Sequence, residues 1–270
     1  MQNNFYCRSY EVHYYEINAL LEATPLTIFA YLEETATCHS ETAGMGVEKV
    51  SKAGKGWVVY RYNLQMQRYP RWQDKVTVAT WVERFKRCFA YRNFHIYDEH
   101  NNLLGRAASQ WVFLDLSSKK PLRIPSRLAD AYTVLPRAAI PEAFQQLPGV
   151  TEPLAGREFT VSAIDIDLNN HANNKRYIHW LLATLPLEIH QNYFPAQIEI
   201  IYKKDALYGN HILSQYQEGP AAGDEKCYLH RLSCLGRKLE LALARTSWQK
   251  RLPQDKSSIK TRHINFRKGL

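Results

Sequence analysis

The residues best suited to chemistry lie in one short polar segment, AIDIDLNNHANNKRYIHWLL, at 163–182. Asp165, Asp167, Asn169 and His171 stand there at alternate positions, directly before an apolar helical pattern. One Asn or Asp is enough to cap a helix or form a turn, so capping alone leaves most of these polar groups unexplained. The surplus makes the segment a candidate catalytic site, with a purely structural turn as the alternative.

Three of these side chains have complementary chemistry. His171 can act as a general base or orient a water molecule, because the pKa of an unperturbed imidazole is near neutrality. If the chain approaches the helix in an extended conformation, Asp167, Asn169 and His171 share one face. Asn173 or Asn174 then caps the helix, whose first free N–H groups would form an oxyanion site. Such a set suits attack by an activated water on a carbonyl, and a thioester is the substrate class that it predicts.

Other chemistries fit the sequence less well. A metal site could combine Asp167 and His171 with His179 or His190, but their spacing matches no zinc pattern. CYLHRLSC at 227–234 resembles metal spacing, yet its alternating pattern is typical of a strand. None of the five cysteines lies in a nucleophile motif. We therefore predict neither a metal nor a cofactor.

The composition indicates a folded protein. Of the 270 residues 45% are hydrophobic and 12% aromatic, which allows a sizeable core. The sequence shows no secretory signal and no apolar run long enough to span a membrane. The odd number of scattered cysteines favours reduced thiols over disulfides, so we expect a cytoplasmic location.

Positive charge is concentrated at the C-terminus. The formal net charge is +9, and residues 249–270 carry seven basic residues and one acidic residue, or +6. Such a tail could attract nucleic acid, an anionic membrane or an acidic protein, or be only a solvated end. Nucleic acid is disfavoured, because no nucleic-acid-binding motif accompanies the charge.

The elements that must position the polar segment form a repeated pattern. A short strand, the helix start Thr24-Pro25 and an apolar series through Phe29 and Leu32 open the first half. Long strands are predicted next, at 56–68, 75–85, 88–98 and 104–116. The second half repeats this order with a strand at 158–164, a helix ended by Pro186, and strands near 196–204, 210–218, 226–234 and 238–249. Both halves read as a helix laid against a curved antiparallel sheet, an α+β pattern.

The predicted boundaries follow from this repeat. Residues 1–120 form the first unit, 121–157 a Pro-rich linker, 158–250 the second unit and 251–270 the basic tail. Only the second unit carries the polar cluster, since the matching stretch of the first reads YEINALLEATP. We therefore expect the first unit to hold an apolar group and the second to react with it.

The segment resembles the active-site segment of the acyl-acyl carrier protein thioesterases, which include the plant FatA and FatB enzymes. Their pattern Asp-x-Asp-x-Asn-x-His-x-Asn-Asn, followed by Tyr and Trp, is matched from Asp165 to Trp180. RSYEV at 8–12, RYPRWQDKV at 68–76 and GRAASQWVFLDL at 105–116 are also similar to that family. The likeness covers nearly the whole chain except about the last twenty residues.

The resemblance implies two tandem hotdog folds, with the acyl chain in the first and catalysis in the second. It carries over Asp167, Asn169 and His171 as catalytic residues, and adds Asp205, where the family usually has glutamate. Ala206 stands where the plant enzymes have cysteine, so a cysteine nucleophile is not expected. Either His171 or Asp205 would then deprotonate water, while Asn169 and backbone amides hold the carbonyl oxygen and Asp167 orients the site.

The expected activity is hydrolysis of fatty acyl-acyl carrier protein, releasing free fatty acid and ending chain elongation. An acyl-CoA thioesterase of the same fold and a non-catalytic acyl-binding protein are the alternatives. The expected partner is the acidic carrier protein, and the chain is expected to be a monomer or a homodimer. Leu26, Phe29 and the strand residues facing them are expected to set the depth of the acyl pocket.

Overall fold

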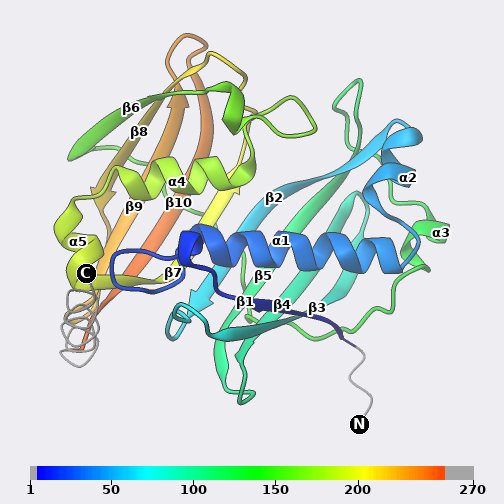
Figure 1. Cartoon of the computed structure of the whole chain (residues 1–270). Helices are drawn as coiled ribbons and strands as arrows, with labels where there is room; N and C mark the ends of the chain where they lie inside the picture. The colour runs from blue at the N-terminus through cyan, green and yellow to red at the C-terminus, as the bar shows by residue number, and fades with distance from the viewer. Residues whose placement is uncertain (1–4, 253–270) are drawn as a thin grey trace, which may run out of the picture.

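The protein is built on one antiparallel sheet of ten strands (Figure 1). The computed structural model describes residues 5–252. The strand order is β1-β3-β4-β5-β2-β7-β10-β9-β8-β6. The strands of the first half are β1 (Tyr6–Glu11), β2 (Lys55–Met66), β3 (Lys75–Lys86), β4 (Phe89–Asp98) and β5 (Leu103–Asp115). Those of the second half are β6 (Ala155–Thr160), β7 (Tyr193–Tyr202), β8 (His211–Glu218), β9 (Lys226–Cys234) and β10 (Leu239–Lys250).

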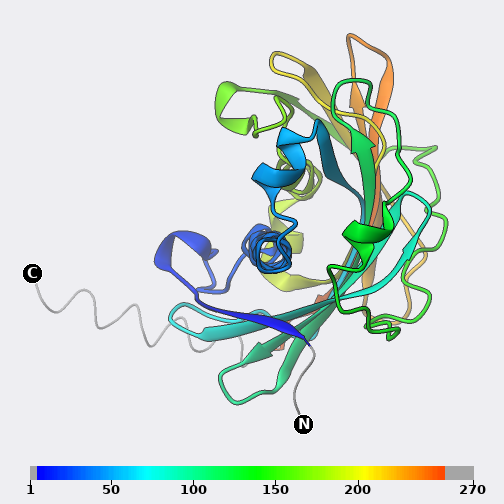
Figure 2. The same cartoon turned by 90° about the vertical axis from the view of Figure 1, so that its right-hand side faces the viewer.

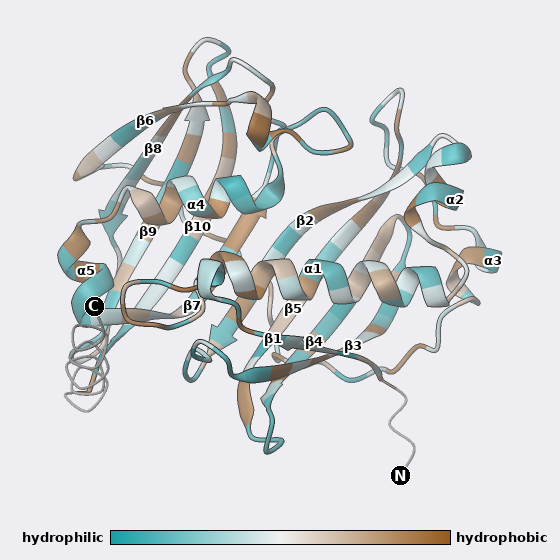
Figure 3. Cartoon of the chain, in the orientation of Figure 1, coloured by the Kyte–Doolittle hydropathy of each residue, from teal (hydrophilic) through white to brown (hydrophobic). Residues whose placement is uncertain are grey.

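Two main helices lie on the concave face of this sheet, α1 (Pro25–Thr42) and α4 (Asn174–Ala183) (Figure 2). They contact each other, one from each half of the chain. Shorter helices are α2 (Val47–Lys52), α3 (Ser126–Ala129) and α5 (Leu187–Asn192), with 3-10 turns η1 (Tyr14–Glu16) and η2 (Ala163–Asp165). Hydrophobic and polar residues alternate along many strands, as expected where one face packs on helices (Figure 3).

Each main helix begins where its sequence predicts. The Thr24 hydroxyl accepts the Thr27 N–H at 3.2 Å, and Pro25 occupies the first turn of α1. The Asn173 side chain accepts the Lys175 N–H at 3.0 Å at the start of α4. Several boundaries differ from expectation by a few residues. The largest difference is in the strand predicted at 158–164, since β6 ends at Thr160 and residues 163–165 form η2 instead.

The two halves share a detailed local repeat before their helices. In the first half η1 leads into a hairpin closed by the bridge Ile17–Ala23, and in the second η2 leads into one closed by Ile166–Ala172. Each hairpin contains a residue with positive φ, Leu21 at 61° and Asn170 at 60°. A helix N-cap follows each hairpin directly. The predicted α+β tandem hotdog is therefore confirmed, and its two sheets are fused into one.

The fusion occurs where β2 pairs with β7, with Arg61 opposite Ile201 and Gln65 opposite Gln197. The segment joining the halves, including the predicted linker 121–157, crosses the outer face of the sheet (Figure 2). It is tied there by side chains of the sheet, since Trp81 donates to the Arg137 carbonyl at 2.7 Å and Asn63 to the Ala143 carbonyl at 2.8 Å. The linker thus covers the face opposite the helices.

A buried carboxylate reinforces the fusion. Glu199 on β7 is 1% exposed and pairs with Arg61 of β2 at 3.1 Å and Arg245 of β10 at 3.0 Å. Burial raises the pKa of Glu199, and the two guanidinium groups oppose that effect. This pairing links one strand of the first half to two strands of the second.

Glu199→Gln should lower the free energy of unfolding by about 3 kcal/mol, because it leaves two arginines at the sheet junction without a counter-charge. Denaturant titration followed by fluorescence measures the change. The matched control is Glu48→Gln, which breaks the exposed 2.6 Å pair with Lys52 on α2 and should cost less than about 0.5 kcal/mol. Equal losses in both variants would contradict a special role for the junction pair.

Candidate active site

The predicted site segment folds as a tight hairpin, so the expectation of an extended approach to the helix was wrong. The Asp167 N–H donates to the His171 carbonyl at 2.8 Å, and the Asn170 N–H donates to the Asp167 carbonyl at 3.0 Å. The turn is completed by Asn170 in the left-handed region, which Asn adopts more readily than most residues. Asp167 and His171 are therefore brought together by backbone pairing across the turn.

Several of the polar residues hold this hairpin in place. Asp165 is buried, accepts two hydrogen bonds from Ser162 and pairs with Arg176 of α4 at 2.6 Å. An oxygen of Asp167 accepts the Asn169 N–H at 2.8 Å. Asn170 supplies the positive φ and Asn173 the helix cap. This division explains why the segment has so many Asn and Asp residues.

The expected oxyanion site at the start of α4 needs correction. The N–H groups of Lys175 and Arg176 already donate to the Asn173 side chain and carbonyl, at 3.0 and 2.8 Å. Within residues 5–252 the Asn169 side chain makes no hydrogen bond, and it lines a cavity. Its carboxamide is therefore the free donor that could hold a carbonyl oxygen.

His171 faces Asp205 from a different part of the chain. The distance from His171 Nε2 to Asp205 Oδ2 is 3.4 Å, slightly longer than a normal hydrogen bond. The His171 side chain is 18% exposed and that of Asp205 is 49% exposed. Solvent therefore reaches this pair, and a modest movement would close the contact.

Tyr177 positions Asp205, a role that the sequence did not reveal. Its hydroxyl donates to the Lys204 carbonyl at 3.1 Å and accepts the Ala206 N–H at 2.7 Å. These are the two peptide groups on either side of Asp205. The sequence predicted Tyr177 on the apolar face of the helix, where it is indeed buried, but its hydroxyl reaches the loop after β7.

An apolar cavity of about 710 Å³ opens beside the hairpin. Its walls include Trp57, Phe85 and Trp111 from the first half, and its rim includes Asp167 and Asn169 from the second. Other lining residues are Ala36, Thr37 and Ser40 of α1 and Val47, Val50 and Ser51 of α2. The cavity thus joins an apolar chamber to the polar hairpin.

The expectation that Leu26 and Phe29 set the pocket depth was wrong. Phe29 is 1% exposed and packs edge-on against Tyr62 in the core, and neither residue lines the cavity. The residues of α1 that line it, Ala36, Thr37 and Ser40, lie about two to four turns further along the helix. The cavity is therefore shifted towards α2.

One residue of the cavity wall, Arg92, pairs with a partly buried histidine of α1. Arg92, only 6% exposed, lines the wall and donates to His39 Nδ1 at 2.8 Å and Thr80 at 3.3 Å. Burial, with a smaller effect from Arg92, lowers the pKa of His39 to about 4. His39 is therefore neutral at physiological pH and can accept this hydrogen bond.

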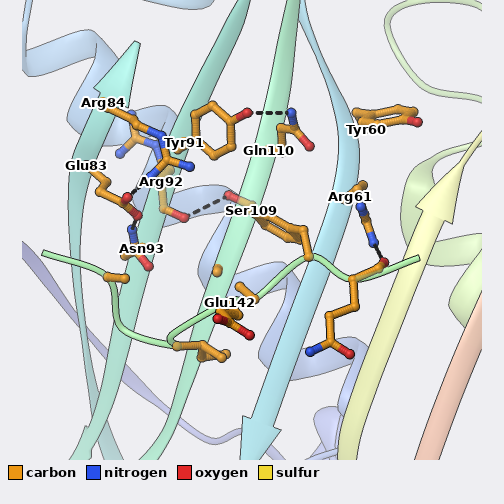
Figure 4. Close-up of a pocket in the computed structure, with 16 residues that line it drawn as sticks. Tyr60, Arg61, Glu83, Arg84, Tyr91, Arg92, Asn93, Ser109, Gln110 and Glu142 are labelled. Carbon is orange, nitrogen blue, oxygen red and sulfur yellow. Dashed lines mark hydrogen bonds and ion pairs between the residues drawn. The ribbon is translucent and has the colours of Figure 1, made fainter. Parts of the chain in front are cut away.

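A second cavity, of about 670 Å³, lies beneath the linker on the outer face of the sheet (Figure 4). Its charged groups are mostly paired within the wall, Arg61 with Glu199 and Arg84 with Glu83. Gln110 also donates to the Tyr91 hydroxyl at 3.1 Å. None of the predicted site residues lines it, whereas Asp167 and Asn169 line the hairpin cavity, which is therefore the candidate active site. His171 and Asp205 line neither cavity.

Residues 5–252 contain no group of three or more His, Cys, Asp or Glu side chains arranged to hold a metal ion. No helix among them has the length and apolar character needed to cross a membrane.

The most similar curated proteins include plant enzymes. The chloroplastic oleoyl-acyl carrier protein thioesterase of Coriandrum sativum is 25% identical, with 91% of this chain and 77% of that protein covered. A chloroplastic acyl-acyl-carrier-protein hydrolase of Cuphea viscosissima is 28% identical, with 90% of this chain covered. This chain spans 62% of the length of that second relative.

Solved structures share the fold. A 12:0-ACP thioesterase from Umbellularia californica superposes with a TM-score of 0.84 at 21% identity, covering 93% of this chain and 96% of that one. An acyl-ACP thioesterase from Bacteroides thetaiotaomicron gives a TM-score of 0.82 at 22% identity, covering 92% and 99%. At these identities the match establishes the double hotdog architecture.

Two family profiles cover most of the sequence. The Acyl-ACP thioesterase N-terminal domain matches residues 3–132, and the Acyl-ACP thioesterase C-terminal domain matches residues 151–250. Together with the hairpin cavity and the shared architecture, these matches show that the chain belongs to the acyl-ACP thioesterase family.

Proposed function

We propose that this protein hydrolyses the thioester of fatty acyl-acyl carrier protein and releases a free fatty acid. The observation that carries the proposal is the apolar cavity of about 710 Å³ lined by Asp167 and Asn169. The same hairpin carries His171, which faces Asp205 at 3.4 Å. Apolar walls suit a fatty acyl chain, and the polar rim suits its carbonyl. Family membership supports the same activity.

The two halves would divide the work. Residues 1–120 provide most of the chamber for the acyl chain, and residues 158–250 provide the reacting side chains. Residues 121–157 join these domains. The proposed basic tail begins at residue 251, but Arg251 is buried and pairs with Glu22 at 2.7 Å, so it is part of the fold. The rest of the tail, from residue 253, lies outside the described residues.

The proposed chemistry is attack by water on the thioester carbonyl. His171 takes a proton from the water, and the Asp205 carboxylate stabilises the imidazolium that forms. The Asn169 carboxamide donates to the carbonyl oxygen as it becomes negative. The C–S bond then breaks, and the departing thiolate takes the proton held by His171. The Asp167 carboxylate accepts the Asn169 backbone N–H at 2.8 Å and so fixes the position of the Asn169 carboxamide.

A turnover assay with acyl chains of increasing length tests the proposal. Each chain is presented both on acyl carrier protein and on CoA, and the free acid is measured. Higher kcat/KM for the carrier-protein series supports the proposal, whereas higher kcat/KM for CoA would indicate an acyl-CoA thioesterase. Binding of the thioester without release of acid would indicate a non-catalytic acyl-binding protein.

His171→Ala should lower kcat by about 10²–10⁴-fold, the usual contribution of a general acid or base. Single-turnover hydrolysis of the preferred thioester measures the loss. His179→Ala is the matched control, because His179 lies on α4 and contacts Phe159 away from Asp205. Near-normal turnover of the His171 variant would remove this residue from the mechanism.

Asp205→Asn should lower kcat by about 10²-fold, because the amide cannot stabilise a charged imidazole. Asp205→Glu should retain or increase kcat, since one more methylene can shorten the 3.4 Å gap to His171. Steady-state rates at saturating substrate compare the two. Equal losses would show that Asp205 has a structural role only.

The proposed carrier protein is acidic, and basic residues lie at the end of the sheet that is nearest to the loop carrying Asp205. The register aligns Arg84 with Tyr91, Gln110, Arg61 and Ile201, a row that ends close to the loop carrying Asp205. Lys86 follows Arg84 on β3, and Lys203 and Lys204 precede Asp205; all three lysines are exposed. Lys75 lies at the opposite end of the same strand β3.

Lys86→Glu should raise KM for an acyl carrier protein thioester by about fivefold at low salt. The substitution reverses a charge at the end of the sheet where we expect the acidic carrier protein to bind. Lys75→Glu, the same substitution at the far end of β3, should leave KM unchanged. In the wild type KM should also rise with ionic strength, because exposed charges are screened beyond about 8–10 Å. A salt-independent KM would contradict recognition by charge.

A further inference from the structure

Arg92 of β4 is an exception among the buried charged residues of the protein. Within residues 5–252 the buried Asp, Glu, Lys and Arg side chains are those of Arg92, Asp165, Glu199 and Arg251. The last three form the ion pairs described above. Arg92, 6% exposed, has no carboxylate partner among these residues. A buried charge without a counter-charge is rare, because the loss of its hydration costs several kcal/mol.

The hydrogen bonds of Arg92 use only one of its three nitrogens. Nη1 donates to His39 Nδ1 at 2.8 Å and to the Thr80 hydroxyl at 3.3 Å. Both partners are neutral, since burial lowers the pKa of His39 to about 4. The other two nitrogens, Nε and Nη2, make no hydrogen bond within residues 5–252, yet surrounding atoms do not seal them off. Arg92 therefore keeps donors that a further acceptor can use.

The sheet register places the Arg92 side chain on the side of the hairpin cavity. Val82 lies directly opposite Arg92 on β3, and Ala90 precedes it by two residues on β4, so the three share one face of the sheet. All three line the hairpin cavity. Arg92 also borders the cavity beneath the linker, but its hydrogen bond to His39 of α1 puts the guanidinium on the helix side.

The surroundings of this guanidinium are mostly apolar. The Tyr132 ring, which also lines the cavity, lies 6.0 Å from the Arg92 guanidinium carbon. Tyr132 packs in turn against Phe85 of the cavity wall, with ring centroids 5.8 Å apart. A cation with free donors thus stands in a wall that otherwise suits a hydrocarbon chain.

Arg92 lies far across the sheet from the reacting side chains. Arg92, Ser109, Tyr62 and Ile200 stand opposite one another on β4, β5, β2 and β7. Neighbouring strands are about 4.8 Å apart, so Arg92 is about 14 Å from β7, the strand that leads to Asp205. A ligand group that reaches Arg92 from the thioester therefore belongs to the distal part of the acyl chain.

We propose that the preferred acyl chain of this protein carries an oxygen on its distal part, and that Arg92 binds this oxygen. The inference rests on the proposed thioesterase function and names its substrate class, a fatty acyl chain with a hydroxyl, keto or carboxylate oxygen. Such an oxygen accepts a hydrogen bond from the charged guanidinium, which is stronger than one between neutral groups. A plain hydrocarbon end would cover the guanidinium without replacing the water that it displaces.

The test compares acyl carrier protein thioesters whose acyl chains end in a methyl, a hydroxyl or a carboxylate group, over a series of chain lengths. At the length that places the oxygen at Arg92, kcat/KM should be about tenfold or more higher for an oxygenated chain than for the methyl-ended chain of equal length. A preference for the carboxylate would identify an anionic group as the ligand. Equal preference for the hydroxyl would identify a neutral acceptor.

Arg92→Met should abolish this preference, because methionine has a similar length but no donor. Arg92→Lys should retain part of it, since the ammonium is also a charged donor. Lys55→Met is the matched control, because Lys55 lines the same cavity but is less buried, and it should leave the preference unchanged. Thermal unfolding of each variant shows whether it is folded.

Binding of free fatty acids provides a measurement that does not depend on turnover. Trp57 and Trp111 line the cavity, so quenching of tryptophan fluorescence can report binding. The wild type should bind the oxygenated acid about tenfold more tightly than the methyl-ended acid, and Arg92→Met should bind both equally.

Two outcomes would overturn the inference. One is equal treatment of oxygenated and methyl-ended chains by the wild type at every length; the other is a preference that survives in Arg92→Met or disappears in Lys55→Met. A protein that binds the oxygenated acid more tightly but hydrolyses no thioester would refute the proposed function alone. An active enzyme without the preference would refute only the role of Arg92.

Discussion

The pairing of β2 with β7 is the contact on which the rest of the structure depends. It turns two sheets into one and fixes α1 and α4 side by side on the same face. The cavity needs this arrangement, because its apolar walls come from the first half and its polar rim from the second. Glu199 reinforces the junction, because its carboxylate pairs with Arg61 and Arg245 on the two neighbouring strands.

The internal repeat shows how one scaffold carries two different tasks. In the first hairpin the Asn18 side chain accepts the N–H groups of Leu20 and Glu22, much as Asp167 accepts that of Asn169 in the second. The fold of the hairpin therefore needs only the first polar residue. The other positions are free to vary, and the second half has Asn169 and a histidine where the first has Leu20 and Glu22.

Most of the architecture could be predicted from the sequence, because strands and helices have their own hydrophobic periods. The site residues stood out as polar groups in excess of what capping needs. The turn at Asn170 could not be predicted, since it depends on a left-handed residue within a run of similar asparagines. The role of Tyr177 was missed because it arises from a contact across the fold.

The same strand junction has a consequence for synthesis of the chain. The first half is complete long before β7 emerges from the ribosome, and until then β2 is an exposed sheet edge with unpaired backbone groups. Arg61 lies on that edge, and its partner Glu199 is made later. A lone charge on an open edge discourages pairing with a second nascent copy. The residue that joins the finished halves is thus also expected to protect the unfinished one from aggregation.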